Sequence, residues 1–175
     1  HNRPTGLTVD ARGNIDWTAP GGSSLANPTG SVFRLRPDGV VSRIGHTFAF
    51  PNGLDVDPAG KYLYVIESQS KKILRYAVPA DDERLGKPEE FYDLGGSGGD
   101  GCAFDAAGNL YLTTGDDTNP FESNLYAPID ARTHRNPQFD APRASAHTND
   151  LRGTVLRLNP QASGAYTIPS GNPSP

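Results

Sequence analysis

The chain has 175 residues, the length of one ordinary domain, and a formal net charge of −4. Its lysines and arginines are scattered, so there is no electrostatic reason to expect nucleic acid or an anionic membrane as a partner. No apolar run approaches the roughly 20 residues that span a bilayer. The first residues do not form a signal peptide, but a signal removed earlier would leave no trace, so the sequence does not indicate a compartment.

The composition favours an all-β protein with many short strands. There are 20 glycines, 16 prolines and no methionine, and the apolar residues recur in short alternating runs. No stretch shows sustained apolar residues at helical spacing.

Three segments of the chain repeat one pattern: a glycine, a short apolar strand ending in Asp, and a tight turn closed by a second glycine. They begin at Gly6, Gly53 and Gly101, which are 47 and 48 residues apart. The Asp of each turn can accept backbone N–H groups, and the closing glycine can adopt a positive φ. A period of this length is typical of β-propeller blades.

Each repeat predicts four strands, as a propeller blade requires. The first two strands of each repeat flank the tight turn, and the last two form an outer hairpin. In chain order the predicted strands are 7–10, 15–18, 31–35 and 40–44, then 54–57, 62–66, 73–78 and 90–94, and finally 102–105, 110–114, 155–158 and 165–168.

The predicted organisation is a single, partial propeller domain over 1–175. Its blades cover about 4–45, 51–94 and 99–170, and the third holds a long insertion at 116–152. Since propellers have roughly four to eight blades, three do not close a ring. We expect half of a six-bladed ring, completed by a homodimer or by a longer parent chain, unless the insertion adds structure to the third unit. The insertion is interpreted as a functional or capping loop, or as partly disordered.

Two motifs, Phe50-Pro-Asn-Gly-Leu-Asp55 and Gly99-Asp-Gly-Cys-Ala-Phe-Asp-Ala-Ala-Gly-Asn-Leu-Tyr111, carry a family resemblance. With them, residues 1 to about 109 resemble the senescence marker protein / gluconolactonase / luciferin-regenerating family of six-bladed propellers. The resemblance implies a divalent metal, most often Ca²⁺, on the channel axis, bound by an Asn, an Asp and a Glu. Asn52 and Asp100 match the first two ligands.

The residues themselves are consistent with such a metal site. Asn52 and Asp100 each directly precede the glycine that opens an inner strand, so equivalent loops would point both side chains into one channel mouth. Oxygen ligands converging there suit a hard cation. The alternative is that both side chains only cap tight turns.

The chain also departs from that family at three ligand or acid positions. The Glu would lie upstream of His1, the Asn-Asp pair expected in the first unit is Pro4-Thr5, and an acid expected near the end of its second strand is Ala19. A metal held by two protein groups would bind loosely.

From about Gly108 onward the chain resembles a second propeller family, the glucose/sorbosone dehydrogenases. The motifs are Gly108-Asn-Leu-Tyr-Leu-Thr-Thr-Gly-Asp-Asp-Thr-Asn-Pro120 and Thr148-Asn-Asp-Leu-Arg-Gly153. This resemblance implies pyrroloquinoline quinone with calcium, and Asp116 matches an acid that orients the family's catalytic His. That His has no counterpart here, so sugar oxidation would lack its base.

Three other reactive side chains are interpreted as structural or surface groups. Cys102, flanked by Ala103 and Phe104, is expected to be a buried thiol and not a nucleophile. His134 and His147 lie in the insertion at spacings that match no ligand or triad pattern.

The leading functional hypothesis is a calcium-dependent hydrolase of sugar lactones or related esters, or a remnant of one. Its partner would be a small-molecule sugar lactone, and Asp100 would take the proton from water. The alternatives are a sugar dehydrogenase that uses pyrroloquinoline quinone and a non-catalytic propeller that binds partners through its loops.

Overall fold

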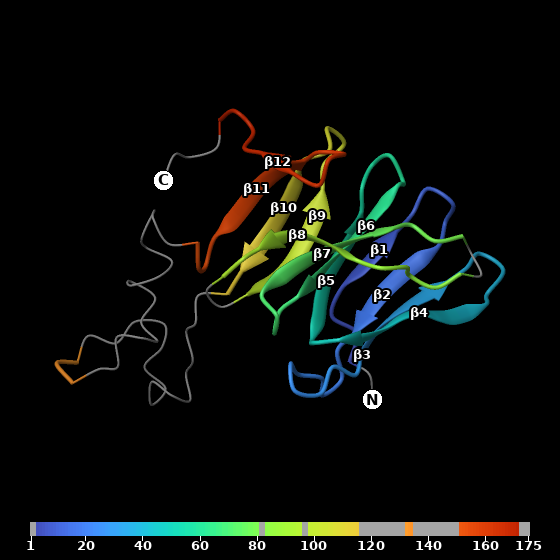
Figure 1. Ribbon diagram of the computed structural model, residues 1–175, viewed down its shortest axis with the longest axis horizontal. Coiled ribbons are helices and arrows are strands. Elements are labelled where there is room, and N and C mark those ends of the chain that lie inside the picture. The colour runs from blue at the N-terminus through green and yellow to red at the C-terminus, as the bar shows by residue number, and fades with distance from the viewer. Residues whose placement is uncertain (1–2, 81–82, 96–97, 116–131, 135–150, 172–175) are drawn as a thin grey trace.

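The computed structural model describes residues 3–80, 83–95, 98–115, 132–134 and 151–171. Over these residues the chain is all-β, and its strands form three four-stranded antiparallel sheets that lie side by side (Figure 1). The predicted fold class, blades of a β-propeller, is confirmed. No helix long and apolar enough to cross a membrane occurs among the described residues.

The first blade is a meander in which each strand pairs with the next along the chain. Its inner turn is closed by Gly13, whose φ of 84° suits glycine, and Asp10 accepts the backbone N–H of Arg12 and of Asn14, both at 2.9 Å. The outer strand is longer than predicted. The strands are β1 (Leu7–Val9), β2 (Ile15–Ala19), β3 (Gly30–Leu35) and β4 (Val41–Phe48).

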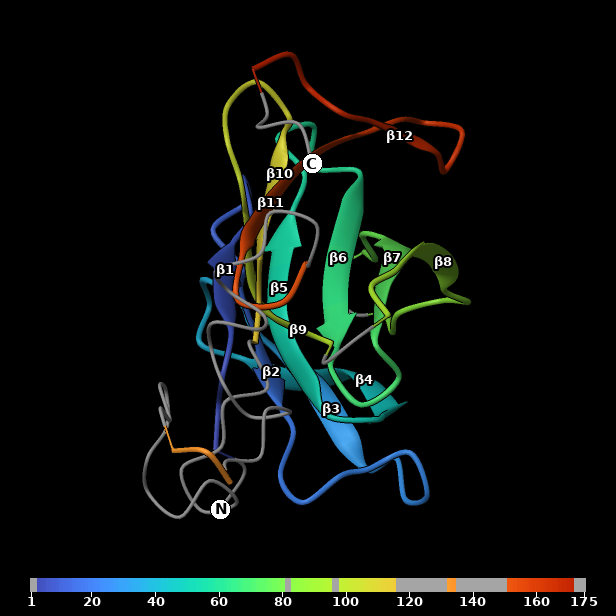
Figure 2. The ribbon, with the colours of Figure 1, turned by 90° about the vertical axis from the view of Figure 1, so that its left-hand side faces the viewer.

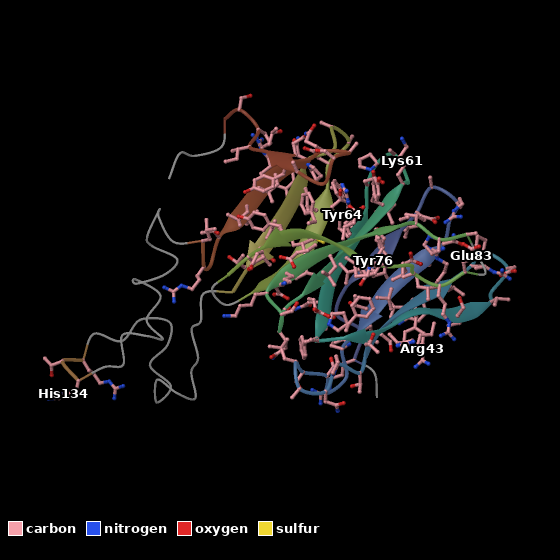
Figure 3. The ribbon with its side chains drawn as sticks, in the orientation of Figure 1. Arg43, Lys61, Tyr64, Tyr76, Glu83 and His134 are labelled. Carbon is pink, nitrogen blue, oxygen red and sulfur yellow. The ribbon has the colours of Figure 1, made fainter. Side chains whose placement is uncertain are left out.

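The second blade repeats this order, and its β6 is buried on both faces. Leu63, Val65 and Tyr76 pack toward the first blade, whereas Tyr64 and Ile66 pack toward the third. Figure 3 labels Tyr64 and Tyr76 in the interior of the molecule. The strands are β5 (Pro51–Val56), β6 (Tyr62–Glu67), β7 (Lys72–Ala77) and β8 (Glu89–Asp93).

The third blade has a complete inner part and a short outer strand. Leu110, Leu112 and Leu158 are buried against the second blade, but Tyr166 in the outer strand is exposed. The strands are β9 (Gly99–Phe104), β10 (Leu110–Thr114), β11 (Val155–Pro160) and β12 (Tyr166–Thr167).

The inner strands β1, β5 and β9 run next to one another, and the other strands of each blade follow outward (Figure 2). Their close approach depends on glycine. A Cβ on Gly6 would lie 2.6 Å from the carbonyl oxygen of Asn52, and one on Gly53 would lie 2.7 Å from that of Asp100. The repeated glycines therefore let adjacent blades meet at the axis, which is what places their neighbouring side chains together.

Candidate functional site

A β-bulge lies at the start of the inner strand in two blades. Between Pro51 and Leu54, β5 has one more residue than the facing part of β6, and between Gly99 and Cys102, β9 has one more than β10. Bulges bend a strand and redirect its side chains, and they are frequent beside active sites. We call this end of the inner strands the bulged end.

The bulges correct one expectation from the sequence. Asn52 and Asp100 do not lie in loops before the inner strands but within β5 and β9, because each strand begins three residues earlier than predicted. At each bulge two residues face one residue of the neighbouring strand: Asn52 with Gly53 in β5, and Asp100 with Gly101 in β9.

Asn52 and Asp100 are in direct contact. The Asn52 Nδ2 atom donates a hydrogen bond to Asp100 Oδ1 at 2.7 Å, which links the second blade to the third. Asp100 is exposed and Asn52 is half-buried. The two side chains that the sequence singled out thus converge from different blades.

Ser68 is the neighbour that sequence reasoning missed. Its Oγ lies 3.3 Å from Asn52 Nδ2, and it donates to the carbonyl oxygen of Gly99 at 2.5 Å. Ser68 directly follows β6, which runs antiparallel to β5, so the end of one strand meets the start of the other. The antiparallel pairing of the two predicted strands was the sequence signal that could have placed Ser68 beside Asn52.

Threonine hydroxyls hold the main chain at this end. Thr18 is fully buried; its hydroxyl accepts from the Gly6 N–H at 2.9 Å and donates to the carbonyl oxygen of Asn52 at 2.5 Å. In the third blade, Thr113 accepts from the Gly101 N–H at 2.9 Å in the same way. Asn52 therefore projects from a backbone that is fixed by the first blade.

The oxygen atoms of this cluster fit a hard divalent cation in type but supply little charge. Asp100 offers a carboxylate and Ser68 a hydroxyl. Asn52 presents its Nδ2 atom to both, and a 180° rotation about χ2 would present its amide oxygen instead. Among the described residues, no three His, Cys, Asp or Glu side chains gather as a metal cluster. Calcium sites use six to eight oxygens, so water or further groups would complete the shell.

Four other reactive side chains were singled out in the sequence. Asp116, the residue matched to the dehydrogenase family, and His147 fall outside the described residues. His134 lies far from the three sheets (Figure 3). Cys102 is half-buried, not fully buried as the sequence predicted. Desolvation raises the pKa of its thiol, so the thiol stays protonated at neutral pH.

The long insertion leaves and re-enters the third blade at this same end. The Thr114 N–H donates to the carbonyl oxygen of Thr154 at 3.1 Å, and the Gly153 N–H donates to that of Gly115 at 3.0 Å. Thr114 pairs with Gly99, the neighbour of Asp100. These two hydrogen bonds form a neck between the insertion and the blade, next to the candidate site.

Comparison with known proteins points to sugar-related propellers. Residues 1–122 match the family described as the SMP-30/Gluconolactonase/LRE-like region. YvrE of Bacillus subtilis (strain 168), a protein assigned as a sugar lactone lactonase, is 31% identical over 84 residues, which are 47% of this chain and 29% of that protein.

Solved structures support the same fold. The gluconolactonase XC5397 from Xanthomonas campestris superposes with a TM-score of 0.56 at 28% identity, over 66% of this chain and 42% of that one. The PQQ-bound aldose sugar dehydrogenase from Streptomyces coelicolor gives 0.62 at 19% identity, over 100% of this chain and 48% of that one, which shows the fold alone. The resemblance of the first two thirds of the chain to the gluconolactonase family is thereby confirmed, and the propeller fold is shared with both kinds of protein. The chain spans less than half the length of each of these proteins.

Proposed function

Because the chain belongs to the SMP-30/gluconolactonase/LRE-like family, we propose that it hydrolyses sugar lactones or related esters at the bulged end, with a divalent cation held beside Asp100. The observation that supports this most is the contact between Asn52 and Asp100, which joins two oxygen-bearing side chains from neighbouring blades. The names of YvrE and XC5397 favour a lactone as the substrate class.

Asp100, Asn52 and Ser68 are the residues that would hold the cation, which we propose to be Ca²⁺. A cation bound there supplies Lewis-acid polarisation of the lactone carbonyl. The protein's part is to present oxygen atoms from a hydrogen-bonded backbone: the hydroxyls of Thr18 and Ser68 donate to the carbonyl oxygens of Asn52 and Gly99.

Asp100 is also the residue that would accept a proton. Its carboxylate is exposed, so water and substrate can reach it, and the hydrogen bond from Asn52 orients it. In the proposed reaction, water adds to the carbonyl carbon as Asp100 takes its proton, and the ring C–O bond then breaks. The departing ring oxygen receives that proton, which leaves an open-chain hydroxy acid.

The test is hydrolysis of glucono-lactone by the purified chain, followed by acid release, with and without added Ca²⁺. We expect activity that depends on calcium and falls by about a hundredfold or more in Asp100→Asn, which keeps the shape of the side chain but removes its charge. Asp38→Ala is the matched control, since Asp38 is an exposed aspartate in the outer turn of the first blade.

Metal binding gives a second, independent measurement. Calcium should raise the melting temperature of the wild type, because a ligand of the native state stabilises it. Asn52→Ala and Asp100→Asn should reduce that rise while leaving the calcium-free melting temperature within a few degrees. No turnover with calcium present, or an equal rise in the wild type and in both variants, would remove the site.

A further inference from the structure

Three of the described residues other than glycine have a positive φ: Thr47 at 72°, Phe50 at 64° and Lys71 at 61°. Thr47 is the extra residue of a β-bulge in the outer strand β4, and Lys71 closes the turn between β6 and β7. Bulges and tight turns are the usual places for this conformation. Phe50 instead lies in the short connection between β4 and β5, directly before the bulged end. Its backbone therefore needs another explanation.

The conformation of Phe50 is unfavourable for two reasons. With a positive φ, the Cβ atom of an L-residue crowds the main chain, and a bulky side chain is an outlier there. In addition, Phe50 precedes Pro51, and the residue before a proline prefers an extended backbone with a negative φ. Glycine would adopt a positive φ without this strain. A large apolar side chain is thus kept at a position that favours glycine.

Hydrogen bonds to the main chain hold Phe50 in this conformation. Its N–H donates to Ser23 Oγ at 3.0 Å, and its carbonyl oxygen accepts from the Ser68 N–H at 3.0 Å. The N–H of the preceding Ala49 donates to Glu67 Oε1 at 2.7 Å. Ser23 is only 4% exposed, so its hydroxyl is a fixed acceptor. Strained residues persist where their surroundings determine them in this way, and they are frequent at binding sites.

The hydrophobic core does not explain why the phenyl ring is kept. Phe48, two residues earlier, is 3% exposed and belongs to the buried cluster of the first two blades. Phe50 is half-buried, and neither of the two buried apolar clusters of the described residues includes it. Its ring is therefore an apolar group at the surface of the bulged end.

Phe50 lies next to the candidate site. Ser68, whose N–H bonds the Phe50 carbonyl oxygen, also places its Oγ 3.3 Å from Asn52 Nδ2. Asn52 follows Phe50 by two residues. The groups of Asn52, Asp100 and Ser68 are all polar, whereas pockets for small ligands are lined mainly by apolar and aromatic side chains with a few polar groups among them. Phe50 supplies the aromatic side chain that such a pocket requires.

We propose that Phe50 determines substrate specificity: its ring is the apolar wall on which the C–H face of a cyclic sugar lactone packs, while the carbonyl group faces Asp100. This inference rests on the proposed function of the bulged end. A rigid aromatic ring offers a large apolar area to a sugar ring. Ser23 is a positioning residue, because its hydroxyl holds the strained backbone that presents the ring. Phe50 touches no reacting atom, so it would bind the ground state and the transition state equally.

The first test is the kinetics of glucono-lactone hydrolysis in the presence of Ca²⁺. Phe50→Ala and Phe50→Gly should raise KM by about tenfold or more and leave kcat within about threefold, as expected when uniform binding is lost. Phe50→Tyr keeps the ring and should stay near the wild-type KM. Thr47→Gly is the matched control, since it relieves the same kind of strain in an exposed residue of the outer strand.

The strain itself is measured without any substrate. Glycine is normally less stabilising than alanine, but at a positive φ the order is reversed. Phe50→Gly should therefore melt at a higher temperature than Phe50→Ala. An alanine variant that melts above the glycine variant would overturn the strained conformation on which the proposal stands.

A double-mutant cycle tests the role of Ser23. Ser23→Ala removes the acceptor of the Phe50 N–H, so the ring is no longer held in place and KM should rise although the ring is present. In the Phe50→Gly background the same substitution should change KM by less than about twofold, because there is no ring to position. Equal effects in the two backgrounds would contradict the positioning role.

Binding of the cyclic sugar ether anhydroglucitol separates this proposal from the proposed function, since the ether has the ring but no carbonyl to hydrolyse. Its dissociation constant, measured by ligand-observed nuclear magnetic resonance, should rise in Phe50→Ala and not in Thr47→Gly. Weaker binding in Phe50→Ala by a chain that hydrolyses no lactone would remove the hydrolysis and keep the wall. Hydrolysis with an unchanged KM in both Phe50 variants would remove the wall alone, and a wild type that binds neither compound would remove both.

Discussion

At the junction between the first and second blades, Arg34 pairs with Asp16 in full burial, whereas at the next junction the equivalent Arg75 pairs with Glu89, whose side chain is mostly exposed. The first pair is bidentate, with both N–O distances at 2.7 Å. The arginine position is common to the two junctions, but the acid comes from the second strand in one and from the fourth in the other.

The reason is the residue beside each arginine. Tyr64 stands in the second blade where Asp16 stands in the first, so Arg75 has no carboxylate next to it on β6. Arg75 instead reaches outward to Glu89 and lies 4.3 Å above the ring of Tyr62. Burial raises the pKa of Tyr64, although its hydrogen bond with Arg75 opposes the rise. The two junctions therefore share the position of the arginine and its backbone, but they differ in which acid pairs with it.

The largest effect is expected from a charge in the apolar part of the first junction. Val56→Asp should prevent folding, a loss of more than about 4 kcal/mol, because the carboxylate would be buried without a partner. Phe104, its equivalent at the second junction, is only half-buried against Tyr64, so Phe104→Asp should cost about 2 kcal/mol. Urea unfolding followed by circular dichroism measures both, and a folded Val56→Asp protein would contradict the ranking.

Alanine substitutions at Gly6 and Gly53 should lower the free energy of unfolding more at the junction where the backbones approach more closely. A Cβ on Gly53 would lie within 2.8 Å of three backbone atoms, whereas one on Gly6 would lie that close to only one. We expect Gly53→Ala to cost about 3 kcal/mol and Gly6→Ala about 1 kcal/mol. The melting temperatures of the two variants test this order. Equal decreases in melting temperature would contradict it and would mean that the inner strands move apart to accept the Cβ atom.

Removing each acid compares the fully buried pair with the pair in which only the arginine is buried. Asp16→Ala should destabilise the protein by about 3–5 kcal/mol, because Arg34 would be left buried without its carboxylate. Glu89→Ala should cost less, about 1–2 kcal/mol, because Arg75 is buried but keeps Tyr62 and Gln161, and the glutamate itself is mostly solvated. The free energies of unfolding at neutral pH are compared, and a larger loss in Glu89→Ala would reverse the interpretation.

The smallest effect is a pH dependence in the inner turn of the first blade. Burial raises the pKa of Asp10, but hydrogen bonds from Asn14 and Arg12 outweigh it and hold the pKa below its usual value. Because the folded pKa is the lower one, Asp10 contributes stability above the unfolded pKa of about 3.9, and that stability is lost as pH falls through the folded value. Asp10→Asn should lower the melting temperature at pH near 7 and match the wild type at the acid end. A constant difference at all pH values would exclude this origin.

The repeat made the fold and its equivalences readable from the sequence, since Gly6, Gly53 and Gly101 mark the same point in three blades. The bulges were not readable, because one extra residue in β5 or β9 shows only when the register with the neighbouring strand is known. The sequence therefore placed Asn52 and Asp100 near one another but on the wrong kind of backbone. Ser68 was missed because its position depends on the same pairing.

The counter-ions were also beyond sequence reasoning. Asp16 and Arg34 are 18 residues apart in the sequence. Their ion pair follows from the register of β2 with β3, and without that register several acids are equally good candidates for the partner of Arg34. Local turn chemistry, in contrast, was read correctly at Asp10 and Asp105, because Asp and Gly at that spacing satisfy the turn without help from other strands.

The neck of the insertion, closed by the hydrogen bonds of Thr114 and Gly153, has a consequence for how this protein can evolve. The four described strands of the third blade all lie before Gly115 or after Gly153. We therefore expect the length of the insertion to change at small entropic cost, because each doubling of a loop costs only about 0.6 kcal/mol. The segment between Gly115 and Gly153 can therefore be replaced by one of another length or sequence while the strand pairings of the third blade are kept.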